Sequence, residues 1–150
     1  MESTAPNCRC RILVADDFPA WRTRICSMLE SMPELTVVGQ ASDGLEAVQR
    51  AVELKPDLIL LDIGLPSING IEAASRIARN NSCASKILFV SENRDADVVT
   101  EALSCPGALG YVLKSEVHTN LRPALEAVLR GERFMSPGLK SPFPGSLVLA

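Results

Sequence analysis

Short apolar runs alternate along the chain with segments whose apolar residues recur at helical spacing. The runs, at residues 11–15, 36–40, 58–61, 87–90 and 109–113, predict five β-strands. Between and after them, apolar side chains stand three or four residues apart, first at Phe18, Trp21, Ile25, Met28 and Met32 and last at Leu121, Ala124, Leu125, Val128 and Leu129. Strands that are nearly all apolar, separated by single helices, predict a parallel sheet covered on both faces. We therefore expect an α/β, flavodoxin-like (βα)5 doubly wound fold with a five-stranded parallel sheet in the order 2-1-3-4-5.

The length of 150 residues favours one domain. We expect residues 1–10 to be an N-terminal extension, residues 11–131 to form the domain, and residues 132–150 to be a C-terminal tail or a truncated linker. Gly131 stands just past the last helical segment, and three prolines follow it. Those prolines exclude a sixth long helix.

Composition excludes several classes of function. Hydrophobic residues make up 47% of the chain, yet no uncharged apolar stretch approaches the roughly 20 residues that span a bilayer, and the N-terminus does not resemble a signal peptide. The net charge is −3 and no basic cluster is present, which disfavours a nucleic-acid surface. We expect a cytoplasmic protein that binds neither membrane nor DNA by itself.

Five scattered cysteines argue against a disulfide framework. Cys8 and Cys10 form a CxC pair that could hold a soft metal, but no second pair stands at ligand spacing. Reduced thiols are therefore expected.

Polar residues directly follow four of the five apolar runs. In open α/β sheets, ligands bind beyond the carboxyl ends of the strands. Asp16 and Asp17 follow the first run, Asp62 the third, Ser91 the fourth and Lys114 the fifth. The runs that carry them are consecutive neighbours in the expected strand order, so we predict that these side chains converge.

Three converging carboxylates repel one another, and a hard divalent cation such as Mg²⁺ relieves that repulsion. Each residue also has a plainer interpretation. Asp17 could cap the following helix, Ser91 could cap a helix entry, Asp62 and Lys114 could be solvated strand ends, and Tyr111 could be an ordinary strand aromatic. Their joint occurrence at four strand ends favours a site.

At these residues the chain resembles the receiver domain of two-component response regulators, from about residue 11 to residue 131. The resemblance implies that Asp62 is the phosphoacceptor and that Mg²⁺ binds Asp17, Asp62 and the backbone carbonyl of Gly64, with Asp16 acting through water. It also implies that Lys114 binds phosphate. Ser91 and Tyr111 match the family's hydroxyl and aromatic switch positions.

Two stretches, residues 64–73 and 110–114, are similar to the branch of the family that carries LuxR-type helix-turn-helix effectors. Residues 130–137 resemble that branch's exit into its linker, so the chain is expected to be a receiver alone or a receiver whose effector domain was lost or removed. Ser115 follows Lys114 where many receivers have a cis proline, and a trans bond is expected because a non-proline cis bond costs roughly 2.5–4 kcal/mol. Residues 104–107 also depart from the family's usual exit of the fourth helix.

The resemblance implies Mg²⁺-dependent acceptance of a phosphoryl group from a sensor histidine kinase, in transcriptional signalling, with no enzymatic activity beyond self-phosphotransfer and self-dephosphorylation. Output would pass through the fourth helix, fifth strand and fifth helix, by self-association or by docking on a partner. A phosphohydrolase would need an acid where Gly64 stands, and a dinucleotide-binding enzyme would need a glycine-rich turn after the first strand. A phosphorylation-independent interaction module remains the alternative.

Overall fold

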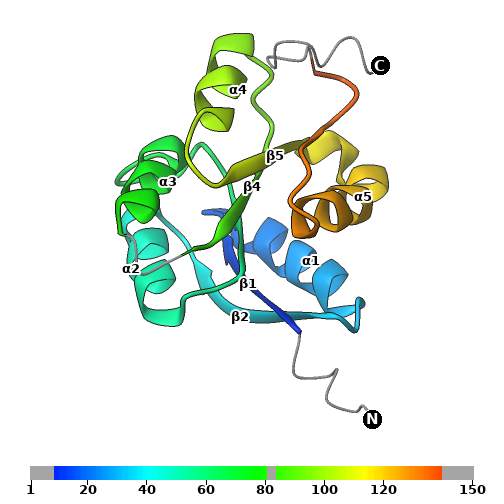
Figure 1. Ribbon diagram of the computed structural model, residues 1–150, viewed down its shortest axis with the longest axis horizontal. Helices are drawn as coiled ribbons and strands as arrows, with labels where there is room; N and C mark the ends of the chain where they lie inside the picture. Colours follow the sequence, from blue (N-terminus) through cyan, green and yellow to red (C-terminus); the bar gives the residue numbers. More distant parts are fainter. Residues whose placement is uncertain (1–8, 81–83, 140–150) are drawn as a thin grey trace.

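The computed structural model describes residues 9–80 and 84–139. Strands and helices alternate along the chain (Figure 1) in the order β1 (Cys10–Ala15), α1 (Pro19–Glu30), β2 (Leu35–Ala41), α2 (Gly44–Leu54), β3 (Leu58–Leu61), α3 (Gly70–Arg79), β4 (Lys86–Ser91), α4 (Ala96–Leu103), β5 (Ala108–Leu113), a 3-10 turn (Lys114–Glu116), α5 (Val117–Leu129) and β6 (Phe134–Met135).

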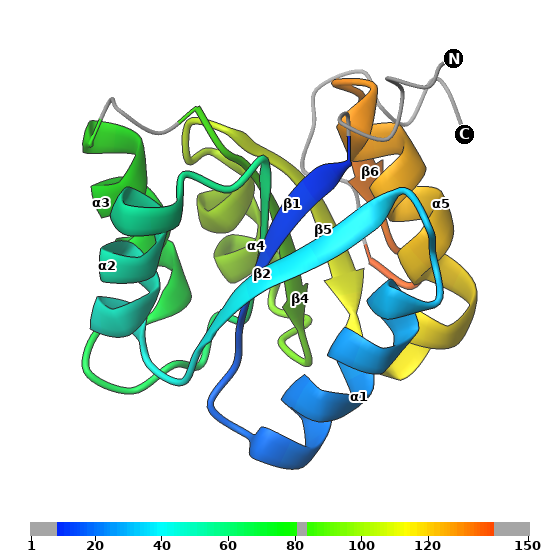
Figure 2. The ribbon, with the colours of Figure 1, turned by 90° about the horizontal axis from the view of Figure 1, so that it is seen from below.

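All the strands lie in one parallel sheet in the order β2-β1-β3-β4-β5-β6. Helices α2, α3 and α4 cover one face, and α1 and α5 cover the other (Figure 2). The predicted doubly wound fold and the order of its five strands are confirmed. Because the order places β1, β3, β4 and β5 side by side, their carboxyl ends share one edge of the molecule.

The sixth strand was not predicted. After α5 the chain turns at Gly131, which has a φ of +80° that glycine adopts without strain, and returns along the free edge of β5. Phe134 and Met135 pair with Gly110 and Tyr111, and the buried Ser136 continues the contact. With only two residues, β6 shows no alternation of its own; the backbone groups of β5 determine where it pairs.

Two apolar cores lie on opposite faces of the sheet, one under α2, α3 and α4 and the other under α1 and α5. Strand β3 is buried along its whole length, as expected for the centre of a doubly wound sheet. The prediction that Phe18 belongs to the apolar face of the first helix was wrong. Phe18 precedes Pro19 as the N-cap residue and is 62% exposed, because the fixed φ of proline starts the helix one residue later.

The sequence departs from the family pattern at residues 104–107 and at Ser115, and the structure shows the path of the backbone at both places. Helix α4 ends at Leu103, and Gly107 with a φ of +85° turns the chain into β5. No cis peptide bond occurs among the described residues, so the Lys114–Ser115 bond is trans as predicted.

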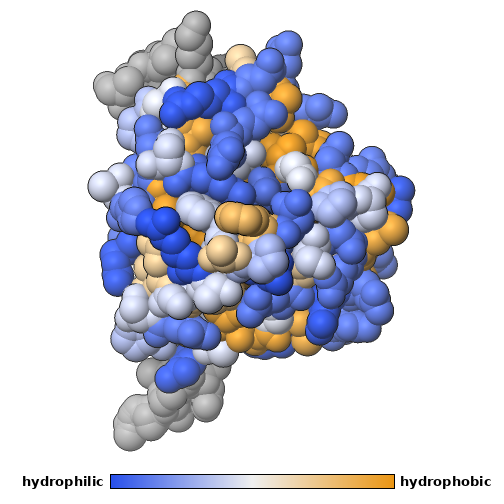
Figure 3. Space-filling model, turned by 180° about the vertical axis from the view of Figure 1, so that it is seen from behind, coloured by the Kyte–Doolittle hydropathy of each residue, from blue (hydrophilic) through white to orange (hydrophobic). Residues whose placement is uncertain are grey.

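No helix among the described residues is long and apolar enough to cross a bilayer. The face opposite to that in Figure 1 is mostly hydrophilic, with small hydrophobic areas between the polar side chains (Figure 3). Cys10, Cys26 and Cys105 are free thiols, whereas Cys8 and Cys83 lie outside the described residues. Burial raises the pKa of the Cys10 thiol to about 11, which keeps this thiol protonated at neutral pH.

Candidate functional site

Three carboxylates meet at the carboxyl ends of β1 and β3. One carboxylate oxygen from each of Asp16, Asp17 and Asp62 lies within 4.8 Å of the other two. Asp16 and Asp62 are buried and Asp17 is exposed. Asp16 Oδ1 accepts a hydrogen bond from the Phe18 N–H at 2.9 Å. In α1, the N-cap residue Phe18 makes no side-chain capping bond. Asp17 therefore stands at the opening of the site without serving as the helix cap.

Lys114, at the end of β5, brings the opposite charge to this cluster. Its ammonium nitrogen lies 2.7 Å from Asp16 Oδ2 and 3.2 Å from Asp62 Oδ2. Burial would lower the pKa of Lys114, but its hydrogen bond to Asp16 and the charges of Asp62 and Asp16 outweigh it, so the pKa is raised. Lys114 is therefore a permanent cation in the site at neutral pH.

Asp62 is a buried carboxylate whose charged form is only partly stabilised by its neighbours. Burial raises the pKa of its carboxyl group, and the charge of Asp16 adds to that effect, while the Lys114 ammonium and the Ile63 N–H oppose it. The Ile63 N–H donates to Asp62 Oδ1 at 2.7 Å. The ionised carboxylate is therefore held in place but incompletely compensated, which leaves it receptive to a further positive charge.

The loop between β3 and α3 is drawn close to this carboxylate. Gly70, the first residue of α3, packs so tightly that a Cβ there would lie 2.0 Å from the Asp62 carbonyl oxygen. The Gly70 N–H donates to the Ile63 carbonyl at 2.8 Å. Gly64 is exposed, and with Asp17, Asp62 and Lys114 it lines an open cleft of about 510 Å³.

Ser91 and Tyr111 are connected through the backbone of Asn93. The Asn93 N–H donates to Ser91 Oγ at 3.1 Å, and the Tyr111 hydroxyl donates to the Asn93 carbonyl at 2.8 Å. Both side chains are buried, and the cap of α4 is Asp95, so Ser91 is not a helix cap. Tyr111 is fully buried in this conformation, and burial raises the pKa of its hydroxyl.

The family model for the response regulator receiver domain matches residues 12–126. The chain belongs to this family. The matched segment contains all the residues of the acidic cluster and also Lys114, Ser91 and Tyr111. The fold and function class predicted from the sequence, a receiver domain of two-component response regulators, are therefore confirmed.

The receiver domain is similar to several known regulators. It is 36% identical over 136 residues to the nitrate/nitrite response regulator protein NarL of Escherichia coli, covering 91% of this chain and 62% of NarL. It is 37% identical over 138 residues to the transcriptional regulatory protein LiaR of Bacillus subtilis, covering 92% of this chain and 63% of LiaR. The chain thus spans less than two thirds of the length of either relative.

Among solved structures, the receiver resembles a two-component response regulator of the LuxR family from Aurantimonas sp. SI85-9A1. The TM-score is 0.80 with 36% sequence identity, over 86% of this chain and 91% of that chain. These similarities support the predicted LuxR-type branch.

Five of the residues predicted for the site line the cleft, namely Asp17, Asp62, Gly64, Ser91 and Lys114. Asp16 pairs with Lys114, and Tyr111 lies within β5 and reaches the cleft-lining Asn93 through its hydroxyl group. The structure adds two residues that the sequence did not single out. Asn93 connects Ser91 to Tyr111, and Trp21 lies beside Lys114. Trp21 was counted only as an apolar helix position. No sequence signal identifies a residue that connects two side chains through its backbone, as Asn93 does.

Proposed function

We propose that this receiver accepts a phosphoryl group on the Asp62 carboxylate, from a phosphohistidine of a sensor histidine kinase or from a small acyl phosphate. The observation that carries the proposal is the convergence of Asp16, Asp17 and Asp62 on Lys114 at the floor of an open cleft. A buried nucleophilic carboxylate beside a permanent cation suits phosphoryl transfer, where positioning and charge neutralisation do most of the work.

The donor atoms at the cleft fit Mg²⁺, which prefers hard oxygen ligands and keeps several waters. Asp17, Asp62 and the Gly64 carbonyl would hold the ion directly. Asp16 already accepts from Phe18 with one oxygen and pairs with Lys114 through the other, which favours its acting through water. The bound ion would offset the negative charge of the carboxylates and of the incoming phosphoryl oxygens.

In the transfer step, an Asp62 oxygen forms a bond to phosphorus while the donor's P–N or P–O bond breaks. The electron pair of that bond leaves with the donor imidazole or carboxylate. Asp62 is oriented by the Ile63 N–H, and Lys114 can exchange a carboxylate partner for a phosphoryl oxygen. The acceptor and its counter-charge are therefore in place before the donor arrives.

The route from the site to the surface runs through Asn93. A phosphoryl oxygen that attracts the Ser91 hydroxyl takes away the acceptor of the Asn93 N–H, and the Asn93 carbonyl is the partner of Tyr111. Asn93 Oδ1 also accepts from the Asp95 N–H, directly before α4. Tyr111 is already buried, so the motion that we propose is a shift of the loop at Asn93 and not an inward rotation of the Tyr111 ring.

Output would pass through α4, β5 and α5, by self-association or by docking on a partner. Because β6 covers the free edge of β5, the contacts would come from the outer faces of the two helices. Val99 and Leu103 are core residues, so they do not supply such contacts.

The similarity to NarL and LiaR supports a role in transcriptional signalling, and we expect no DNA binding by this chain alone.

The test is incubation with acetyl phosphate and Mg²⁺, read by intact mass. The wild-type chain should gain one phosphoryl group, and Asp62→Asn should gain none. Asp57→Asn is the matched control, because Asp57 stands before the opposite end of β3 and asparagine retains the oxygen that accepts from Arg11 N–H. Labelling of Asp62→Asn would refute the assignment, and an unlabelled wild type would favour the phosphorylation-independent interaction module.

A further inference from the structure

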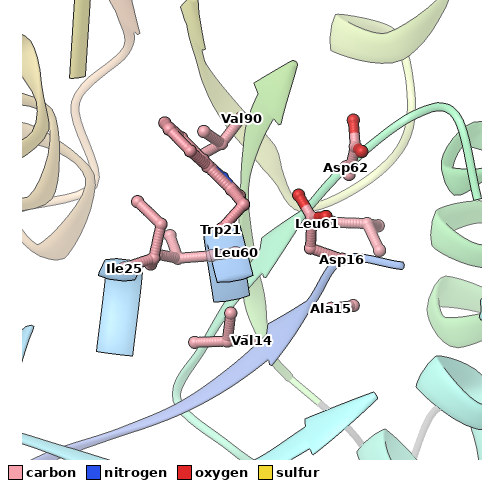
Figure 4. Close-up of a pocket in the computed structure, with 9 residues that line it drawn as sticks. All are labelled: Val14, Ala15, Asp16, Trp21, Ile25, Leu60, Leu61, Asp62 and Val90. Atoms are coloured by element: carbon pink, nitrogen blue, oxygen red, sulfur yellow. The ribbon is translucent and has the colours of Figure 1, made fainter. Parts of the chain in front are cut away.

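Trp21 is the only tryptophan of the chain, and the phosphoacceptor mechanism above does not use it. It extends from α1 toward β4, and its ring lies beside Val90 (Figure 4). With Asp16 and Asp62 it lines a small cavity of about 10 Å³ behind the carboxylates. Its ring centroid is 5.2 Å from the Lys114 ammonium nitrogen. Trp21 therefore contacts the phosphate-binding lysine from the side of the core.

In the proposed mechanism, Lys114 has to change its hydrogen-bond partners when Asp62 is phosphorylated. Before phosphorylation its ammonium pairs with Asp16 and Asp62, and after phosphorylation it has to pair with the phosphoryl group on Asp62. A lysine side chain has a flexible four-carbon stem, so releasing one carboxylate allows the ammonium to move to solvent. Something has to keep the ammonium near the site while its hydrogen-bond partners change.

An aromatic ring meets that need. The face of an indole attracts an ammonium within about 6 Å of the ring centroid, and it does so without a fixed hydrogen-bond geometry. The ammonium can thus turn its N–H groups toward new acceptors while it stays over the ring. Lys114 is only 12% exposed at its side chain, so the attraction is weakly screened by water.

We propose that Trp21 is a positioning residue that holds the Lys114 ammonium over the carboxylate cluster while it passes from Asp16 to the phosphoryl group. The inference rests on the proposed phosphoacceptor function and acts through Lys114. The plainer role of Trp21 is packing, since it is half-buried against the core under α1 and α5. The two roles can be separated by experiment. Packing depends on the volume of the side chain, whereas attraction of the ammonium depends on its aromatic face.

The experiment compares Trp21→Phe with Trp21→Met. The two side chains are similar in size and both shrink the residue, but only phenylalanine keeps an aromatic face. The rate constant for labelling by acetyl phosphate is measured as a function of Mg²⁺ concentration. We expect the maximal rate constant of the Met variant to be about fivefold below that of the Phe variant. The half-saturating Mg²⁺ concentration should be the same in both, because both variants keep the proposed Mg²⁺ ligands Asp17, Asp62 and Gly64.

Arg24→Gln is the matched control. The Arg24 guanidinium also lies over the Trp21 ring, at 5.6 Å, but Arg24 is exposed and hydrogen-bonds to His118 instead of to the carboxylate cluster. Its removal should leave the rate constant unchanged. Melting temperatures of all variants verify folding, and Trp21→Leu replaces Trp21→Met if the Met variant does not fold.

Equal maximal rate constants for the Phe and Met variants would overturn the inference and leave Trp21 a packing residue. A change in half-saturating Mg²⁺ without a change in maximal rate would also overturn it, because the effect would then be on the metal site. Failure of the phosphoacceptor function itself is a different result, in which the wild-type chain is not labelled.

Discussion

At the scale of single residues, Asp62 is placed where its charge is costly. Burial raises the pKa of its carboxyl group above the ordinary value. The folded chain therefore holds this proton to a higher pH than the unfolded chain does. The stability that this group contributes is fully present below the unfolded pKa of about 4, and it is lost as the pH rises through the folded pKa.

The first prediction is that Asp62→Asn stabilises the receiver without Mg²⁺ at neutral pH, by about 1 kcal/mol, because it removes an incompletely compensated buried charge. The gain should shrink as the pH falls toward 4, because the wild-type carboxyl group takes up its proton as the pH falls through its raised pKa. Urea unfolding at the two pH values measures both effects. Asp57→Asn should change stability by less than about 0.5 kcal/mol. A variant that is less stable than the wild type at neutral pH would contradict this account.

At the scale of elements, the short strand β6 is tied to the strand that carries Tyr111. The Ser136 N–H donates to the Tyr111 carbonyl at 3.0 Å, and the Leu113 N–H donates to Ser136 Oγ at 2.9 Å. Ser136 is 1% exposed, so water cannot replace these bonds. Met135 and Leu139 also pack against the core under α2, α3 and α4.

We predict that Ser136→Ala lowers the free energy of unfolding by about 1–3 kcal/mol, since it leaves the Leu113 N–H without an acceptor in a buried position. Chemical denaturation gives the value. Ser115→Ala, an exposed serine near the same edge, should stay within about 0.5 kcal/mol of the wild type. If the two variants behave alike, Ser136 does not anchor the segment after α5.

At the scale of the whole molecule, Mg²⁺ should act as a ligand of the folded state only, because the acidic cluster joins residues far apart in the sequence. We predict that the melting temperature rises with millimolar Mg²⁺, since binding to the folded state stabilises it by mass action. Asp17→Ala should remove most of the rise. An undiminished rise in that variant would place the metal elsewhere.

The last prediction concerns self-association. Beryllofluoride with Mg²⁺, which mimics the phosphoryl group, should strengthen association through α4, β5 and α5, and a coupling of about 1–3 kcal/mol corresponds to roughly a 5- to 150-fold change in affinity. Sedimentation velocity with and without the mimic measures it. Tyr111→Phe keeps the ring but loses the bond to the Asn93 carbonyl, so it should weaken the response while Asp62 is still labelled. A full response in that variant would show that Tyr111 does not transmit the effect of phosphorylation to this surface.

The sequence alone determined the fold and the cluster, because both follow from local patterns. Continuous apolar runs identify buried parallel strands, and in such a sheet the residues that follow Ala15, Leu61 and Leu113 must come together at one edge. Strand order and polar ends are enough to bring Asp16, Asp62 and Lys114 into contact. No detailed packing was needed for that prediction.

Only the tertiary structure decided the contacts that depend on packing between elements. Trp21 and Lys114 are far apart in the chain, and the ring reaches the ammonium only because α1 packs against the sheet so that Trp21 lies beside Ala15 and Val90. The burial of Tyr111 and the pairing of Phe134 with β5 likewise depend on neighbours from other segments. Hydrophobic periodicity specifies which face of an element is buried, but the atoms that meet there are set by close packing of the whole molecule.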